Sequence, residues 1–156
     1  MTLADAVRLV ERLRTQRKTI VFANGVFDLL HPGHVRYLRH ARSLGDALVV
    51  GLNSDGSVRE NKGPGRPIVP EDERAEIVAA LACVDAVVVF DEPTPQTIIE
   101  ALQPDVLVKG ADYKKEQVVG WDFVEANGGR VALAPLISGR STSAVIQRII
   151  EAYTPE

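Results

Sequence analysis

The sequence contains few of the residues that build disulfides and metal sites. Among its 156 residues there are one cysteine and three histidines. The single cysteine, Cys83, excludes an internal disulfide and a zinc site made of several cysteines. It lies in the apolar stretch AALACVDAVVV, which predicts a buried, inert thiol. The sequence therefore favours a reducing compartment and a fold held together by its core.

Long hydrophobic runs are also lacking. No apolar run reaches the length needed to cross a bilayer. The first 18 residues, MTLADAVRLVERLRTQRK, carry charges throughout and contain no continuous apolar segment of the kind found in a signal peptide. We therefore expect a cytoplasmic protein with no membrane partner.

An excess of positive charge is absent as well. The formal net charge is -3, which argues against the broad basic surface that duplex nucleic acid or anionic lipid requires. Small-molecule substrates are the expected partners, with no nucleic acid. The length suits one compact domain, which we expect over residues 1–156, with an N-terminal helix at about 2–16 and a core at about 19–153.

Apolar runs alternate with helical patterns along the chain. The runs are continuous, which is typical of parallel strands buried on both faces, and they lie at 19–23, 47–52, 85–90, 105–109 and 130–134. Helices are predicted at 3–13, at 33–43, from Pro70 through Leu81, after a Thr94 cap, at 122–127, and along the stripe Val145, Ile149 and Tyr153. This pattern predicts an α/β fold, namely a Rossmann-like, doubly wound, five-stranded parallel sheet of order 3-2-1-4-5 with helices on both faces.

Polar and glycine-rich segments follow the predicted strands. They read NGVFDLLHPGH, NSDGS, KGADY and SGRSTS, and they gather at one edge of a parallel sheet. In the predicted order, strands 1 and 4 are neighbours at the point where strand order reverses, so residues 24–34 should face residues 109–112 across a crevice. The stretch 53–70 is rich in glycine and proline, which predicts a mobile loop with one helical turn near its start.

Two histidines, His31 and His34, flank Pro32 and Gly33. A zinc site would need further ligands, but the third histidine lies on the same predicted helix and Cys83 is expected to be buried, so no metal site is predicted. A solvent-exposed pair, an acid/base pair and a phosphate grip at a helix N-terminus all remain open from the residues alone. In the last of these, Gly33 would let a phosphate approach the backbone.

The segment GVFDLLHPGH resembles the H-x-G-H signature of the nucleotidyltransferase superfamily, and SGRSTS resembles its late phosphate loop. A wider set of segments resembles the D-glycero-β-D-manno-heptose 1-phosphate adenylyltransferases, the nucleotidyltransferase half of bifunctional ADP-heptose synthesis enzymes. These segments are NGVFDLLHPGHVRYLRHARSLGD, NSD, KGPGRP, ER at 73–74, DEPTPQ, PDVLVKGADY, ANGG and STS, spread over about 20–150. The sugar-kinase half is absent from this sequence, so a stand-alone form is expected.

The resemblance implies transfer of AMP from ATP to a heptose 1-phosphate, giving ADP-heptose and pyrophosphate for lipopolysaccharide core precursor synthesis. It implies Mg²⁺ bound mostly by the nucleotide, with no metal ligand from the protein. It also implies a homo-oligomer, with a dimer favoured. The N-terminal helix and the surface around Trp121 and Phe123 are the candidate interfaces.

Site residues are implied position by position. The catalytic residues would be His31, His34, Lys62 and Arg74. The nucleotide-binding residues would be Asn24, Gly25, Val26, Phe27, Gly33, Lys109, Gly110, Asp112, Ser141, Thr142 and Ser143. The substrate-binding residues would be Asp28 and Arg66.

Structural alternatives stand beside these roles. Lys62 and Arg66 could be solvated loop charges, and Arg74 could pair with Asp72 or Glu71. Asp28 could organise its loop, and the Ser141–Ser143 cluster could serve as a helix cap.

Other functions remain open. One is a related enzyme with another acceptor, of the glycerol-3-phosphate cytidylyltransferase or FAD synthetase type. Val26 and Leu136 differ from the cytidylyltransferase pattern, which weakens cytidine as the base, and the role of Arg140 is open. A class I aminoacyl-tRNA synthetase fragment is disfavoured because the chain has no K-M-S-K-S loop. A non-catalytic nucleotide-binding module is the remaining alternative.

Overall fold

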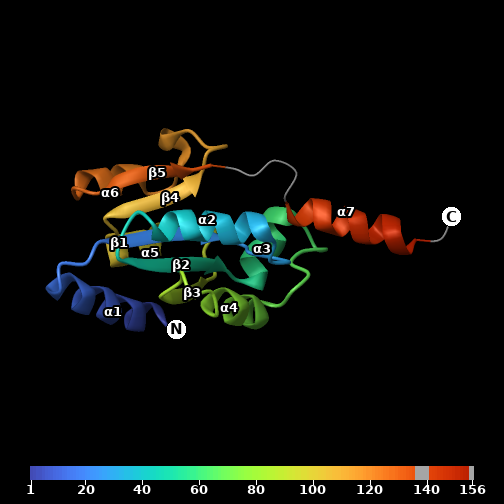
Figure 1. Ribbon diagram of the computed structural model, residues 1–156, viewed down its shortest axis with the longest axis horizontal. Coiled ribbons are helices and arrows are strands. Elements are labelled where there is room, and N and C mark those ends of the chain that lie inside the picture. Colours follow the sequence, from blue (N-terminus) through green and yellow to red (C-terminus); the bar gives the residue numbers. More distant parts are fainter. Residues whose placement is uncertain (136–140, 155–156) are drawn as a thin grey trace.

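The computed structural model describes residues 1–135 and 141–154. Its centre is a parallel sheet of order β3-β2-β1-β4-β5 (Figure 1), as predicted. The strands are β1 (Ile20–Gly25), β2 (Ala47–Asn53), β3 (Ala86–Phe90), β4 (Val106–Gly110) and β5 (Arg130–Ala134). Because strand order reverses between β1 and β4, a crevice opens beyond their carboxyl ends.

Helices connect the strands and cover both faces of the sheet. They are α1 (Leu3–Thr15), α2 (Pro32–Arg42), α3 (Asp55–Lys62), α4 (Glu71–Ala79), α5 (Gln96–Leu102), α6 (Trp121–Ala126) and α7 (Thr142–Tyr153), with a 3-10 turn η1 (Lys115–Gln117). In the described part of the chain, none of them has the length and apolar character needed to span a bilayer.

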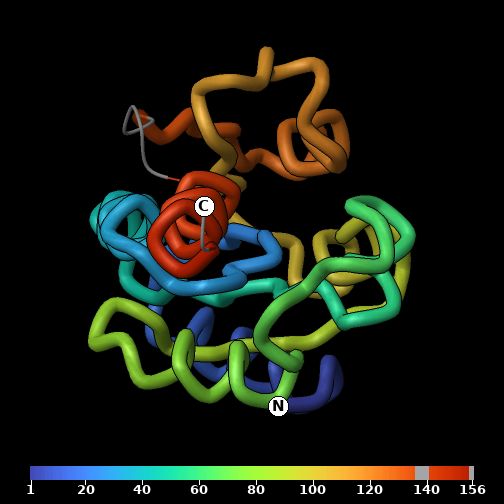
Figure 2. Tube along the Cα trace, turned by 90° about the vertical axis from the view of Figure 1, so that its right-hand side faces the viewer, coloured from blue at the N-terminus to red at the C-terminus, as the bar shows by residue number. Residues whose placement is uncertain are grey.

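Successive strand residues point to two separate cores. Ile20 and Phe22 pack with α1, α5 and α6, whereas Val21 and Ala23 pack with α2 and α4. Figure 2 shows α2 and α5 on opposite sides of the sheet. Since both faces are buried, every position of the inner strands is apolar, which explains the continuous hydrophobic runs in the sequence.

The segment 53–70 contains more regular structure than the sequence predicts. The single helical turn expected there is wrong, because α3 extends from Asp55 to Lys62. The hydroxyl of Ser54 caps this helix by accepting a bond from the backbone N–H of Ser57, at 3.2 Å. The dense glycines and prolines lie after the helix, where Gly63 ends it with φ +91°.

Several predicted boundaries need correction. Thr94 does not cap α5, which begins at Gln96 with Pro95 before it and no side-chain cap bond. β1 extends to Gly25 because Asn24 and Gly25 pair with β2. Cys83 is partly exposed at the edge of the core rather than buried.

The apolar stripe of α7 is not part of the core. The helix projects beyond the ends of the strands (Figure 1). Ile149 is 49% exposed, Ile150 is 51% exposed and Tyr153 is 83% exposed. In contrast, the apolar face of α1 packs against the sheet, where Ala6 and Val10 are buried.

Candidate active site

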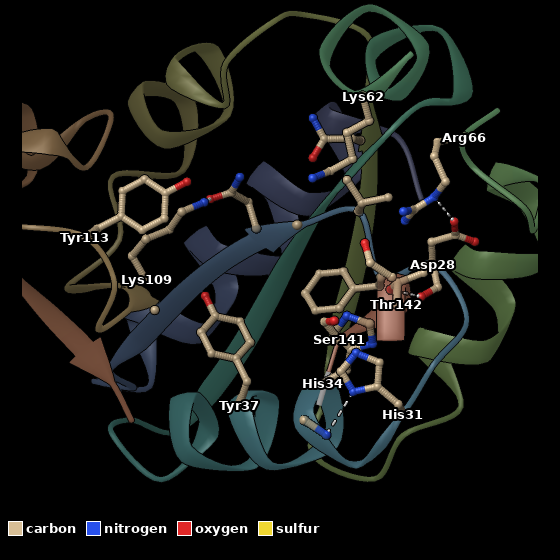
Figure 3. A pocket seen from close by; sticks show the side chains of 18 of the residues that line it. Asp28, His31, His34, Tyr37, Lys62, Arg66, Lys109, Tyr113, Ser141 and Thr142 are labelled. Carbon is tan, nitrogen blue, oxygen red and sulfur yellow. Dashed lines mark hydrogen bonds and ion pairs between the residues drawn. The ribbon is translucent and has the colours of Figure 1, made fainter. Parts of the chain in front are cut away.

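A cavity of about 590 Å³ lies at the carboxyl ends of β1 and β4. Most of its lining comes from the loop from β1 to α2, the end of α3 with the following loop, the end of β4, and the start of α7 (Figure 3). It brings together the predicted site residues Asn24, Gly25, Val26, Phe27, Asp28, His31, Gly33, His34, Lys62, Arg66, Lys109, Gly110, Ser141, Thr142 and Ser143. Arg74 and Asp112 are not among the residues that line it.

The two histidines stack at the start of α2. Their ring centroids are 3.8 Å apart. His31 is the N-cap residue, and its Nδ1 accepts a hydrogen bond from the backbone N–H of Gly33 at 3.1 Å. This bond places the proton of a neutral His31 on Nε2, which makes that atom a donor. The Gly33 N–H is therefore engaged by a side chain, although the sequence suggested that it would meet a phosphate directly.

His34 is held as a neutral ring. Burial, together with the nearby His31, lowers the pKa of His34 to about 4, while Asp28 acts in the opposite direction. Its Nδ1 is buried and has no hydrogen-bond partner among the described residues. A buried polar atom without a partner costs about 1–3 kcal/mol, and such atoms in native structures often mark functional sites.

Aromatic side chains form one wall of the cavity. The ring of Phe27 meets His34 edge-on, with 5.4 Å between centroids. The Tyr37 hydroxyl donates to the carbonyl of Val108 at 2.9 Å, and burial raises the pKa of this phenol. The wall therefore connects α2 to β4 and limits the freedom of the histidine rings.

Two lysines from different elements, Lys62 and Lys109, reach into the cavity (Figure 3). Lys62 is the last residue of α3. The side-chain amine of Lys109 donates a hydrogen bond to Asn24, with 3.4 Å between Nζ and Oδ1. The same amine lies 5.2 Å from the centre of the Tyr113 ring. Burial and Lys62 both lower the pKa of Lys109, while Asp112 raises it.

Asp28 organises the loop after α3. Its carboxylate accepts bonds from the Arg66 side chain and from the backbone N–H groups of Ile68 and Val69, at 2.8 to 3.0 Å. Burial alone would raise the pKa of Asp28, but these three bonds lower it. Of the two roles that the sequence left open for Asp28, loop organisation is the one visible in these contacts.

Arg74 lies beneath the cavity rather than in it. Its side chain is 1% exposed. The guanidinium donates to the carbonyls of Val69, Val26 and Asn53, and it pairs with Asp55 at 2.7 Å. The alternative of a pairing with Asp72 or Glu71 is wrong in its partner, because the carboxylate that pairs with Arg74 is Asp55. These contacts make Arg74 a positioning residue for the loop that carries the histidines.

The start of α7 closes the cavity from the other side. Thr142 Oγ1 donates to the backbone carbonyl of Asp28 at 2.7 Å. Ser141 is the N-cap residue, and its hydroxyl accepts from the Ala144 N–H. Capping and phosphate binding are compatible here, since both use the same helix terminus. Leu136 and Arg140 lie outside the described residues.

Sequence reasoning missed four lining residues, namely Tyr37, Asn53, Tyr113 and Pro135. Two of them carried a usable signal. Tyr37 lies three positions after His34 on a predicted helix, which puts both on one face. Asn53 directly follows a predicted strand, at the same sheet edge as Asn24.

For Arg74, we predict that Arg74→Lys lowers the free energy of unfolding by about 3 kcal/mol, since lysine cannot reproduce the fork that serves three carbonyls. Urea unfolding of the purified variant measures this loss. Arg59→Lys, an exposed position on α3, is the matched control and should be neutral. A variant of unchanged stability but reduced activity would instead support the catalytic role that the resemblance implies for Arg74.

For His34, we predict a stability that falls between pH 6.5 and pH 4. The unfolded chain protonates this ring near pH 6.5, whereas the folded protein does so near pH 4, so acid favours unfolding in that window. The loss should be about 2 kcal/mol, after allowance for partial exposure of the ring. Asp28, whose pKa is below its usual 3.8, loses its contribution only at lower pH.

Unfolding midpoints of His34→Asn across this range should show a shallower pH dependence than the parent protein. His40→Asn, on the same helix, controls for the loss of a histidine. Equal slopes in the parent and His34→Asn would contradict the neutral, buried ring.

Several proteins of known name are similar to this chain. It is 59% identical over 145 residues to the bifunctional protein HldE of Syntrophotalea carbinolica, covering 93% of this chain and 30% of that protein. It is 57% identical over 148 residues to the bifunctional protein HldE of Geobacter metallireducens, covering 95% of this chain and 30% of that protein. The chain thus spans about 30% of the length of these curated relatives.

A solved structure is also similar, that of the lipopolysaccharide core biosynthesis protein from Thermoplasma volcanium. The TM-score is 0.63 at 30% sequence identity, over 77% of this chain and 97% of that one. A family model described as cytidylyltransferase-like matches residues 22–148. These matches confirm the resemblance to the nucleotidyltransferase superfamily, and the chain belongs to the cytidylyltransferase-like family.

Proposed function

We propose that this protein transfers AMP from ATP to D-glycero-β-D-manno-heptose 1-phosphate, giving ADP-heptose and pyrophosphate for lipopolysaccharide core precursor synthesis. The observation that carries the proposal is the stacked His31–His34 pair, which opens onto a cavity entered by Lys62 and Lys109. The similarity to HldE proteins and to a lipopolysaccharide core biosynthesis protein supports the choice of acceptor.

The reaction needs charge stabilisation and positioning more than acid/base chemistry. An oxygen of the acceptor phosphate attacks the α-phosphorus of ATP and forms the new P–O bond. The bond from the α-phosphorus to the bridging oxygen breaks, and its electrons leave with pyrophosphate. The attacking phosphate is already ionised, so no general base is required.

The cavity residues suit that task. His31 presents an Nε2–H donor, as its bond to Gly33 requires. Lys62 and Lys109 supply positive charge on the opposite side of the cavity (Figure 3). Donors held in place before the reaction stabilise charge that develops on the transferred phosphate.

Mg²⁺ is proposed to arrive with ATP. Of the described residues that line the cavity, Asp28 alone carries a carboxylate, and three protein donors already occupy it. These residues do not fit a metal site of their own, whereas nucleotide phosphates bind Mg²⁺ readily. The ion is therefore treated as part of the substrate.

The family description makes CTP the natural competitor of ATP. Pyrophosphate release with ATP and CTP, each paired with heptose 1-phosphate, other sugar 1-phosphates, glycerol 3-phosphate and FMN, tests the proposal. ATP with heptose 1-phosphate should be turned over fastest. Preference for CTP or for a non-sugar acceptor would favour the related enzymes, and nucleotide binding without pyrophosphate release would indicate a binding module.

We predict that His34→Ala lowers kcat about a hundredfold or more, as loss of a group that stabilises the transition state typically does. Pyrophosphate release under saturating substrates measures it, and circular dichroism checks the fold. His40→Ala, outside the cavity, is the control. Turnover close to that of the parent protein would contradict the phosphate grip.

We also propose a cytoplasmic homodimer. The interfaces suggested by the sequence are largely used inside the chain, since α1, Trp121 and Phe123 pack against the core. The exposed stripe of α7 is the proposed interface instead, because exposed apolar patches commonly mark interaction sites.

The dimer has a direct test. Light scattering should give twice the chain mass, and Ile149→Glu on α7 should give the monomer, because a buried carboxylate in an apolar interface is costly. Ile77→Glu, at an exposed isoleucine on α4, should leave the dimer intact. Dissociation by both variants, or by neither, would argue against α7 as the interface.

A further inference from the structure

A second, smaller cavity opens beside the first. Its volume is about 230 Å³, which is below the range of about 300–1,000 Å³ that holds a drug-sized ligand. Both cavities are lined by Asn24, Asn53, Lys109 and Tyr113. These four residues form a junction between a large compartment next to the histidines and a small one next to α3 and the start of α5.

The small cavity is rich in amide and hydroxyl groups with unused hydrogen-bonding capacity. Asn61 donates one amide proton to the Ser57 carbonyl at 3.0 Å, and the Gln117 oxygen accepts from the Lys114 N–H at 2.9 Å. Their remaining amide groups, and the Thr94 hydroxyl, make no further hydrogen bond among the described residues. Groups that donate and accept are the natural partners of sugar hydroxyls, which also do both.

Apolar groups complete the lining. Val118 and Pro95 are buried, and Pro93 and Val119 are at the exposed rim. A pyranose ring presents C–H groups as well as hydroxyls, so a mixed lining of this kind suits it. A triphosphate does not suit this space, because the only cation in its lining among the described residues is Lys109, at the junction.

The junction suits a phosphate. The Lys109 amine lies there beside Asn24, and the proximity of Lys62 helps to lower the pKa of Lys109. An anion between the two lysines would relieve their repulsion. A phosphate at this point would also lie between the small compartment and the histidines.

We propose that the small cavity binds the sugar ring of the acceptor, that the junction holds its 1-phosphate, and that the large cavity holds the nucleotide. This inference rests on the proposed function and deepens it. It makes Asn61, Thr94 and Gln117 residues that determine acceptor specificity, a role that sequence reasoning did not assign to them.

Filling the small cavity tests the assignment. Thr94→Trp should raise the KM for heptose 1-phosphate about tenfold or more, while ATP affinity measured by calorimetry stays within about twofold. Thr97→Trp makes the same change at an exposed threonine of α5 that does not line the cavity, and it should have neither effect. An equal loss of ATP affinity in Thr94→Trp would assign the cavity to the nucleoside. An unchanged KM for heptose 1-phosphate would show that the sugar does not bind in the small cavity. Either outcome overturns the proposal.

Removing one amide provides a gentler test. Asn61→Ala should raise the KM for the sugar phosphate about tenfold, the size of one lost hydrogen bond, with kcat little changed. Asn127→Ala is closely matched, since Asn127 also donates to the carbonyl four residues earlier but is the C-cap residue of α6 and lines neither cavity. Similar effects of both substitutions would indicate a purely structural role and would overturn the proposal.

Failure of the proposed function would look different. It would appear in the unmodified protein, as transfer of AMP to some other phosphorylated acceptor or to none. With another acceptor, a selective rise of its KM in Thr94→Trp would still support the small cavity as the acceptor compartment. Failure of the cavity assignment would instead leave transfer to heptose 1-phosphate intact in the unmodified protein, with no selective rise of the acceptor KM in Thr94→Trp.

Discussion

The loop from β1 to α2 depends on hydrogen bonds that reach it from three distant segments. Arg74 on α4 donates to the carbonyl of Val26, and Thr142 on α7 donates to the carbonyl of Asp28. The Asp28 carboxylate in turn bonds to backbone N–H groups of the segment before α4. Phe27 has φ +50°, a conformation that costs a non-glycine residue about 1–3 kcal/mol unless its surroundings impose it. These bonds provide such surroundings.

The consequence for the site is rigidity at its most important point. With the loop held, Phe27 stays against the His34 ring, and His34 stays stacked on His31. Catalysis by charge stabilisation requires donors that are already in place, because reorganisation during the reaction costs energy. The cationic groups have more freedom to move than this loop, since Lys62 and Lys109 are long side chains that reach in from the ends of their elements.

The electrostatics of the cavity differ from those of the whole molecule. The chain has a net charge of -3. In contrast, two lysines and an arginine line the cavity, and Asp28, the one acidic residue among its described lining residues, is paired with Arg66. A local positive field attracts phosphates without giving the protein a basic surface that would bind nucleic acid. His34, which burial and the nearby His31 keep neutral, adds no further positive charge to the cavity.

Particular residues illustrate how far the sequence could predict the fold and the site. The strand order and the placement of Lys109 opposite Asn24 followed from hydrophobic runs and from the polar segments after them, which are local features. The length of α3 was underestimated, as a single helical turn, because glycines and prolines just beyond the helix dominated the composition of the segment. Arg74 was placed in the site by the family resemblance alone. Its burial, with four donor contacts, becomes visible only when Val26, Asn53, Asp55 and Val69 are brought together.

By itself, the sequence determined the alternation of strands and helices, the edge of the sheet at which the site lies, and the H-P-G-H turn that begins α2. These depend on residues close together along the chain. Only the tertiary structure decided that Asp28 and Arg74 organise the loop, that α7 leaves its apolar stripe uncovered, and that a second cavity adjoins the first. Hydrogen-bond satisfaction, burial and cavity shape are determined by segments far apart in the sequence, and no local pattern encodes them.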